Sequence, residues 1–226
     1  MLSPLHPLSS SRPHREGRRV PNSDFVSASV RLLLVGARLT PAADLYSTAR
    51  HEAGHAIAAH AVGRRVVALR CTRKELAADD PINPYEVPFM TYGFHQSEPL
   101  RGAEVQECLR EGARLPAELQ HWCLQDAVIC LAGPIAEGIL GEEGSGHDIA
   151  EWAKSAIALG QPGRSGTRFY DATAAVARTI IEDLDADLRV LIVRLIREGE
   201  METPSIADAL QDLPSGSHTD LLEALL

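Results

Sequence analysis

The chain has 226 residues, of which 45% are hydrophobic and 23% are charged, a composition that is ordinary for one globular domain. Its net charge of −9 argues against a general nucleic-acid-binding protein, because the overall charge would not attract phosphates. Aromatic residues make up only 4% of the chain. Together with the many Ala, Leu and Ile residues, this favours a mostly helical core over a β-sandwich.

The N-terminal region differs in composition from the rest. Residues 1–40 hold Pro, Ser and Arg with little apolar periodicity, so we expect a largely disordered extension before a domain that spans 41–226. The apolar stretch "SVRLLLVGARL" carries two Arg and is shorter than the ~18–20 residues that span a membrane. The N-terminus lacks the apolar run of a secretory signal, and the four cysteines form no C-x-x-C pair. We therefore expect a cytoplasmic protein with free thiols and no membrane contact.

The domain is expected to begin with a helix over 41–63, capped by Ser47 or Thr48 and ended by Gly63. Alternating β-branched residues predict a strand over 65–73. "FMTYGFH" predicts a second strand, which we expect to pair with the first as an antiparallel hairpin after a proline-containing loop.

From Pro116 onward the apolar pattern becomes helical. We expect helices over 117–141, with Gly133-Pro134 as a site for a kink, over 147–160, over 167–199 as one helix or two, and over 203–213. The predicted fold class is therefore α+β and predominantly α-helical, with a small β-hairpin beside a helical bundle.

The first helix carries His51-Glu52-Ala53-Gly54-His55, an H-E-x-x-H motif. Residues four apart on a helix differ by about 40° of rotation, so His51 and His55 project from one face and could bind one zinc ion. Glu52 lies about 100° further round, where it could take a proton from a metal-bound water. Chance alone would produce the motif in about 3% of chains of this composition. However, the Ala, Ile and Gly neighbours predict a buried helix, where unpartnered polar groups would be costly.

A catalytic zinc needs a third protein ligand, and the downstream candidates are Glu137, His147 and Asp148. Glu137 could instead lie on the surface, or orient a ligand imidazole without touching the metal. Asp148 could be only the partner of Ser145 in a helix capping box. Spacing alone does not choose between them. The longer metzincin motif would need a histidine one residue beyond His60, so we expect His60 on the helix surface.

Three segments, "ARHEAGHAIAAHAVG", "LAGPIAEGIL" and "GSGHDIAEWAKSAIALG", in this order and spacing resemble the peptidase domain of the FtsH family of ATP-dependent zinc proteases. The resemblance covers roughly residues 44–210. It implies a zincin-like active-site helix with Glu52 as the general base, and it leaves Glu137 a supporting role. It also implies a zinc ion held by His51, His55 and Asp148.

The sequence departs from the family pattern at several points. The family's Arg before the A-E pair is replaced near Pro134, the residue before the ligand aspartate is His147 where the family often has Asn, and Trp152-Ala153 stands in place of Ala-Thr. The sequence contains no G-x-x-x-x-G-K-[ST] phosphate loop and no membrane-spanning stretch. We therefore expect a stand-alone peptidase that does not bind ATP and cuts unstructured polypeptides. In that family the ATPase module contributes to ring assembly, so a homo-oligomer is left open.

The leading hypothesis is a zinc-dependent metalloendopeptidase with Glu52 as the general base. The alternative is a catalytically silent binding or adaptor protein with the same fold, against which the intact Glu52 counts; hydrolysis of a non-peptide amide is a third option. The strand "MTYGFH" could pair with an extended peptide. Tyr92, His95 and His147 are candidates for stabilising the oxyanion.

Overall fold

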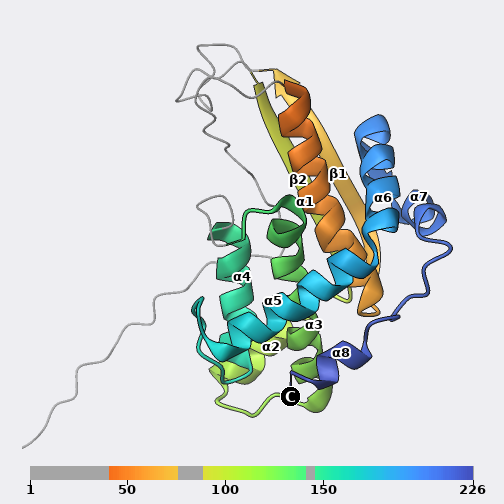
Figure 1. Ribbon diagram of the computed structural model, residues 1–226. Coiled ribbons are helices and arrows are strands. Elements are labelled where there is room, and N and C mark those ends of the chain that lie inside the picture. Colours follow the sequence, from red (N-terminus) through yellow and green to blue (C-terminus); the bar gives the residue numbers. More distant parts are fainter. Residues whose placement is uncertain (1–40, 76–88, 141–145, 226) are drawn as a thin grey trace, which may run out of the picture.

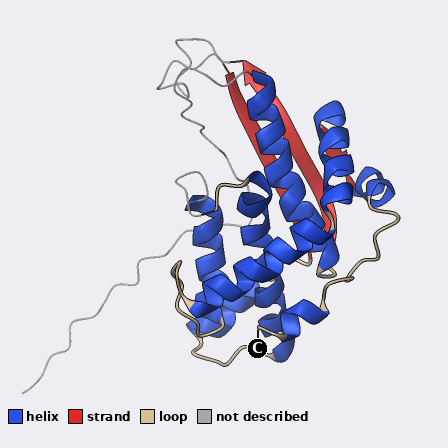
Figure 2. Cartoon of the chain, viewed as in Figure 1, coloured by secondary structure: helices blue, strands red, loops and turns tan. Residues whose placement is uncertain are grey.

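The computed structural model describes residues 41–75, 89–140 and 146–225. These residues form a mostly helical domain with one small antiparallel sheet (Figures 1 and 2), which confirms the predicted α+β, predominantly helical fold. The expected N-terminal extension over 1–40, the loop residues 76–88 and the capping residue Ser145 lie outside the described residues.

The helices and strands follow one another in the order α1 Pro41–Ala61, β1 Arg65–Glu75, β2 Phe89–Glu98, α2 Gly102–Arg110, α3 Ala117–Glu137, α4 Gly146–Ala158, α5 Arg168–Asp183, α6 Asp185–Glu198, β3 Glu200–Glu202, α7 Thr203–Ala209 and α8 Asp220–Glu223. The predicted hairpin is confirmed, because β1 and β2 pair antiparallel with Leu69 opposite His95. The segment 167–199 forms two helices that break at Leu184. The elements α2, β3 and α8 were not predicted; β3 pairs with β1 and gives the sheet order β2-β1-β3.

Two predictions about α1 are wrong. The helix begins at Pro41, so Ser47 and Thr48 lie within it and do not cap it. Proline is well tolerated in a first turn, where its missing N–H would have had no helical partner. His60, expected on the surface, is half-buried, and its Nε2 hydrogen-bonds the carbonyl oxygen of Leu213 at 2.7 Å.

Helix α1 is central to the domain. It lies along the face of the β1–β2 hairpin and also packs against α3 and α6 (Figure 1). Its crossing with α3 is close, because a Cβ at Gly54 would lie 2.6 Å from Ala136 Cβ and 2.8 Å from the carbonyl oxygen of Ala132. The small buried residues around the motif therefore allow α1 and α3 to approach each other closely, in line with the buried helix that the Ala, Ile and Gly neighbours of the motif predict.

Arg64, just beyond the end of α1, is buried and joins several elements. Its Nη1 donates to Asp126 of α3 at 3.0 Å, and its Nη2 donates to the carbonyl oxygen of Pro99 at 3.3 Å. Its guanidinium lies 4.8 Å from the centre of the Trp122 ring, a cation–π distance. Ser155 of α4 donates to the second carboxylate oxygen of Asp126 at 2.8 Å. This Arg64 network therefore links α1, α3 and α4.

No helix in the described ranges has the length and apolar character needed to cross a membrane. The four cysteines are free thiols. Burial, with the nearby Asp126 carboxylate, raises the pKa of the Cys123 thiol to about 12, and burial likewise raises the pKa of Cys130. Both thiols stay protonated at neutral pH and are poor nucleophiles or metal ligands.

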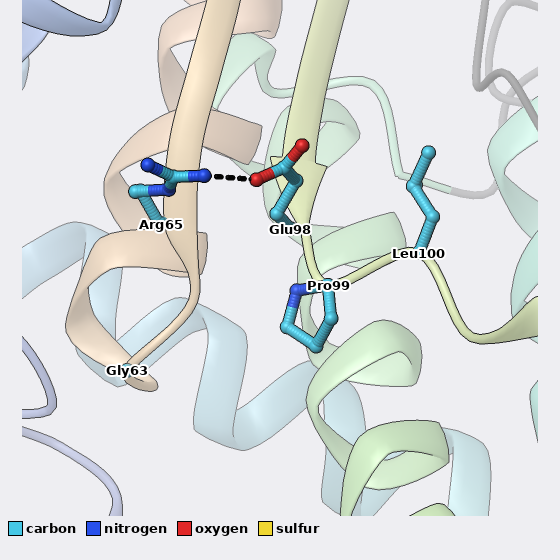
Figure 3. A pocket seen from close by; sticks show the side chains of 5 residues that line it. All are labelled: Gly63, Arg65, Glu98, Pro99 and Leu100. Carbon is cyan, nitrogen blue, oxygen red and sulfur yellow. Dashed lines mark hydrogen bonds and ion pairs between the residues drawn. The ribbon is translucent and has the colours of Figure 1, made fainter.

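We expect Asp126→Asn to lower the free energy of unfolding by about 2 kcal/mol, because it leaves the buried Arg64 charge without its carboxylate. This is below the ~3–5 kcal/mol of a fully buried pair because the Asp126 side chain is 24% exposed. The exposed Arg65–Glu98 ion pair between β1 and β2 (Figure 3) provides the control. Glu98→Gln should cost no more than about 1 kcal/mol. Urea denaturation of both variants measures the difference, and equal losses would contradict the structural role of the Arg64 network.

Candidate metal centre

The structure brings His51, His55 and Asp148 together. The two histidines project from one face of α1, as their spacing predicts, and Asp148 lies in the first turn of α4. All three side chains are buried, and one nitrogen or oxygen atom from each lies within 4.8 Å of those of the other two. His51 Nε2 is 3.3 Å from Asp148 Oδ2, and His55 Nε2 is 3.4 Å from Asp148 Oδ1.

Helix α3 fixes the orientation of both imidazoles through their other ring nitrogens. His51 Nδ1 lies 2.9 Å from Glu137 Oε2, and His55 Nδ1 lies 2.7 Å from the carbonyl oxygen of Ile129. A carboxylate and a carbonyl oxygen accept hydrogen bonds, so each Nδ1 is the donor. Ser47 Oγ in turn donates to Glu137 Oε1 at 2.5 Å. In the neutral rings the Nε2 lone pairs are therefore left to face the cluster, as ligand histidines require.

These donor groups fit a divalent metal ion. The two Nε2 atoms are 3.1 Å apart and both face the carboxylate of Asp148. Electron pairs that converge in a buried site repel one another unless a cation or a proton lies among them. Two imidazoles and one carboxylate form a ligand set that is common for catalytic zinc and also suits other divalent transition metals.

The pKa values of the cluster show what happens without a metal. Burial acts to lower the pKa of His51, but hydrogen bonds with Asp148 and Glu137 outweigh it and raise this pKa to about 9. Burial acts to raise the pKa of Asp148, but the hydrogen bonds with His51 and His55 hold it well below its usual range. At neutral pH the metal-free cluster therefore keeps a proton on His51, next to an ionised Asp148.

Two glycines make room for the site. A Cβ at Gly133 of α3 would lie 2.6 Å from His55 Cε1, and a Cβ at Gly93 of β2 would lie 2.7 Å from the carboxyl carbon of Glu52. A side chain at either position would displace its neighbour. Neither glycine was predicted from the sequence to have a role in the site. The sequence offered one indication for each: Gly133 lies inside a predicted helix and Gly93 inside a predicted strand. A glycine at such a position lowers stability by about 0.5–1 kcal/mol relative to alanine, so its presence there needs a reason.

Glu52 and His95 occupy the side of the site formed by β2. Glu52 is buried against Gly93, and the ring of His95 stacks on that of His55 with centroids 5.6 Å apart. Burial, with smaller contributions from the neighbouring His55 and Arg64, lowers the pKa of His95 well below its usual range, so its ring is neutral. Its Nε2 is buried without a hydrogen-bond partner among the described residues. An unpaired atom of this kind costs about 1–3 kcal/mol.

The other residues proposed from the sequence as a third ligand or as an oxyanion donor differ in where the structure places them. Glu137 contacts His51 and not the ligand-atom cluster, in line with the supporting role implied by the resemblance. His147 is exposed, and the side chain of Tyr92 lies outside the part that the structure describes. Ser47 was predicted only as a helix cap and not as a support of the site, although it lies four residues before His51, on the same face of α1.

A comparison with models of known protein families finds no match to this chain, and a comparison with curated proteins finds none either.

We expect Asp148→Ala to weaken zinc binding by more than about a hundredfold, because it removes one of three converging donors. Glu137→Gln alters the hydrogen-bond partner of His51 Nδ1 and no ligand atom, so it should weaken zinc binding by about 10–100-fold. Competition with a chromophoric chelator measures both affinities. Unchanged affinity in Asp148→Ala would remove Asp148 from the site and return Glu137 or His147 as the third ligand.

Zinc binding should release about one proton at pH 7, because the metal displaces the proton that His51 holds with a pKa of about 9. Since that proton competes with the metal, the apparent affinity should fall about tenfold for each pH unit below 9. Calorimetric titrations in buffers with different ionisation enthalpies count the released protons. The absence of proton release at pH 7 would contradict the raised pKa.

Proposed function

We propose that this protein is a zinc-dependent endopeptidase that hydrolyses peptide bonds in unstructured polypeptides, with Glu52 as the general base. The observation that supports it best is the buried convergence of His51, His55 and Asp148, with the Glu52 carboxylate on the next residue of the same helix. Zinc held there would lower the pKa of a coordinated water toward 7 and polarise the scissile carbonyl.

Glu52 moves the protons in this reaction. Water oxygen bonds to the carbonyl carbon, and a carboxylate oxygen of Glu52 accepts a proton from that water. As the carbon–nitrogen bond breaks, Glu52 passes the proton to the leaving amine nitrogen. Glu137 holds the ring of His51 by accepting from its Nδ1, on the side away from the cluster, and Ser47 in turn donates to Glu137.

The edge of β2 supports the choice of an extended substrate. In the sheet order β2-β1-β3, no described strand pairs with the edge of β2 that faces away from β1. A peptide in extended form can add to such an edge through main-chain hydrogen bonds. Because β2 packs against α1, a peptide on this edge would pass beside Glu52. Folded segments cannot pair in this way, so we propose flexible polypeptides as the substrate class.

The cysteines support a reducing compartment. All four are free thiols, as is usual for proteins of the cytoplasm. We therefore propose a cytoplasmic location for the peptidase.

We expect Glu52→Gln to leave folding and zinc affinity intact and to lower peptide cleavage by about 10⁴-fold, the upper end of the range for loss of a general base. The amide keeps the size of the side chain but cannot accept the proton. Cleavage of casein and of a peptide library measures the effect. Activity above a tenth of wild type would remove Glu52 from the mechanism. A wild-type protein that binds zinc but cleaves nothing would favour the binding-protein alternative.

Gly93→Ala and Gly133→Ala should have different effects, because the first displaces Glu52 and the second displaces His55. We expect Gly93→Ala to lower kcat by about 10²-fold through misplacement of the base while zinc affinity changes little. Gly133→Ala should weaken zinc binding itself. Chelator competition and cleavage assays on both variants test this. Equal losses of zinc affinity would show that Gly93 does not act through Glu52.

A further inference from the structure

The face of β2 that packs on α1 lies beside the H-E-x-x-H motif. Residues two apart on a strand point to the same side, and Gly93 and His95 are both buried on the side that faces α1. Gly93 lies against Glu52, and His95 lies against His55. The strand thus runs beside α1 in the same direction and places the His95 imidazole next to the metal ligands and the base.

His95 differs from the two motif histidines in its hydrogen bonding. Both ring nitrogens of His51 and of His55 have polar partners. His95 Nε2 is buried with no partner among the described residues. An apolar ring would pack against His55 at this position without burying an unpaired nitrogen, so a histidine here carries a cost that packing does not explain. A partner supplied by a bound ligand would remove that cost.

The burial of His95 does not set it apart from the reacting groups. His95 is 5% exposed, compared with 2% for Glu52 and 3% for His55. A substrate that reaches Glu52 and the ligand cluster would therefore also come close to His95, which stacks on the ring of His55.

We propose that Nε2 of His95 donates a hydrogen bond to the carbonyl oxygen of the scissile peptide as negative charge develops on that oxygen. This inference rests on the proposed peptidase function. In the tautomer that carries its proton on Nε2, a neutral imidazole is a donor there. A donor held in place in a buried site stabilises the developing oxyanion without having to reorganise. The proton stays on Nε2 throughout, so His95 makes or breaks no covalent bond.

The test compares His95→Phe, which keeps a ring against His55 but has no donor, with His95→Gln, which keeps an N–H donor. His121→Gln, on the exposed side of α3, is the matched control. We expect His95→Phe to lower kcat by about 10²–10³-fold, while KM and zinc affinity stay within about threefold of wild type. His95→Gln should recover at least about tenfold of the lost kcat, because it can still donate.

A second readout does not depend on turnover. A phosphinic peptide carries, in place of the scissile carbonyl, a tetrahedral phosphorus that bears a negatively charged oxygen. Calorimetry on the zinc-loaded protein should show that His95→Phe weakens its binding by about 10²-fold. In ¹⁵N-histidine-labelled wild type, the same peptide should shift the Nε2–H resonance of His95 downfield. This measurement decides the question if His95→Phe does not fold.

Four results would overturn the inference. In the first, cleavage and phosphinic-peptide binding of His95→Phe stay within about threefold of wild type. In the second, the His95 resonance of wild type stays unchanged when the phosphinic peptide binds. Zinc affinity could fall more than about tenfold in His95→Phe, which would make His95 a positioning residue for His55. Finally, wild type could bind zinc but neither cleave peptides nor bind the phosphinic peptide, and this alone would overturn the proposed function as well.

Discussion

The hydrogen bonds that α3 makes with the Nδ1 atoms of His51 and His55 are the constraint on which the site depends. Their acceptors, Glu137 and the carbonyl oxygen of Ile129, belong to one helix, so the crossing of α1 with α3 decides where both Nε2 lone pairs point. That crossing can be close only because Gly54 has no side chain. A shift of α3 along α1 would rotate both imidazoles at once, so the packing of these two helices sets the geometry of the candidate metal site.

Helix α4 brings the third donor to this pair and is held by contacts that do not involve the cluster. Trp152 is fully buried and donates to Thr173 of α5 at 3.0 Å, and Ser155 bonds to Asp126 in the Arg64 network. These contacts do not involve a metal ion. The cluster is therefore preorganised, with the proton on His51 taking the place of a cation, and a metal would replace that proton in a site that already exists.

Much of this arrangement could be predicted from the sequence, and the rest could not for physical reasons. A four-residue spacing is enough to place His51 and His55 on one helix face, since it depends only on local geometry. The choice of Asp148 over Glu137 depends on how α3 and α4 pack, which no local pattern encodes, and only the family resemblance pointed to it. Elements such as β3 and α8 are too short for a hydrophobic period to be visible. The break at Leu184 has neither Gly nor Pro to mark it.

The position of Glu52 explains why α1 has to lie between two different partners. On the helix, Glu52 is rotated by about 100° from His51, so it cannot face α3 and α4 together with the ligands. It faces β2 instead, where Gly93 leaves room for its carboxylate. The Nδ1 atoms of His51 and His55 thus bond to α3 of the helical bundle, whereas Glu52 lies against β2 of the sheet. In the proposed peptidase, a substrate strand beside β2 would meet Glu52 on the sheet side of α1, with the ligand cluster about 100° round the same helix.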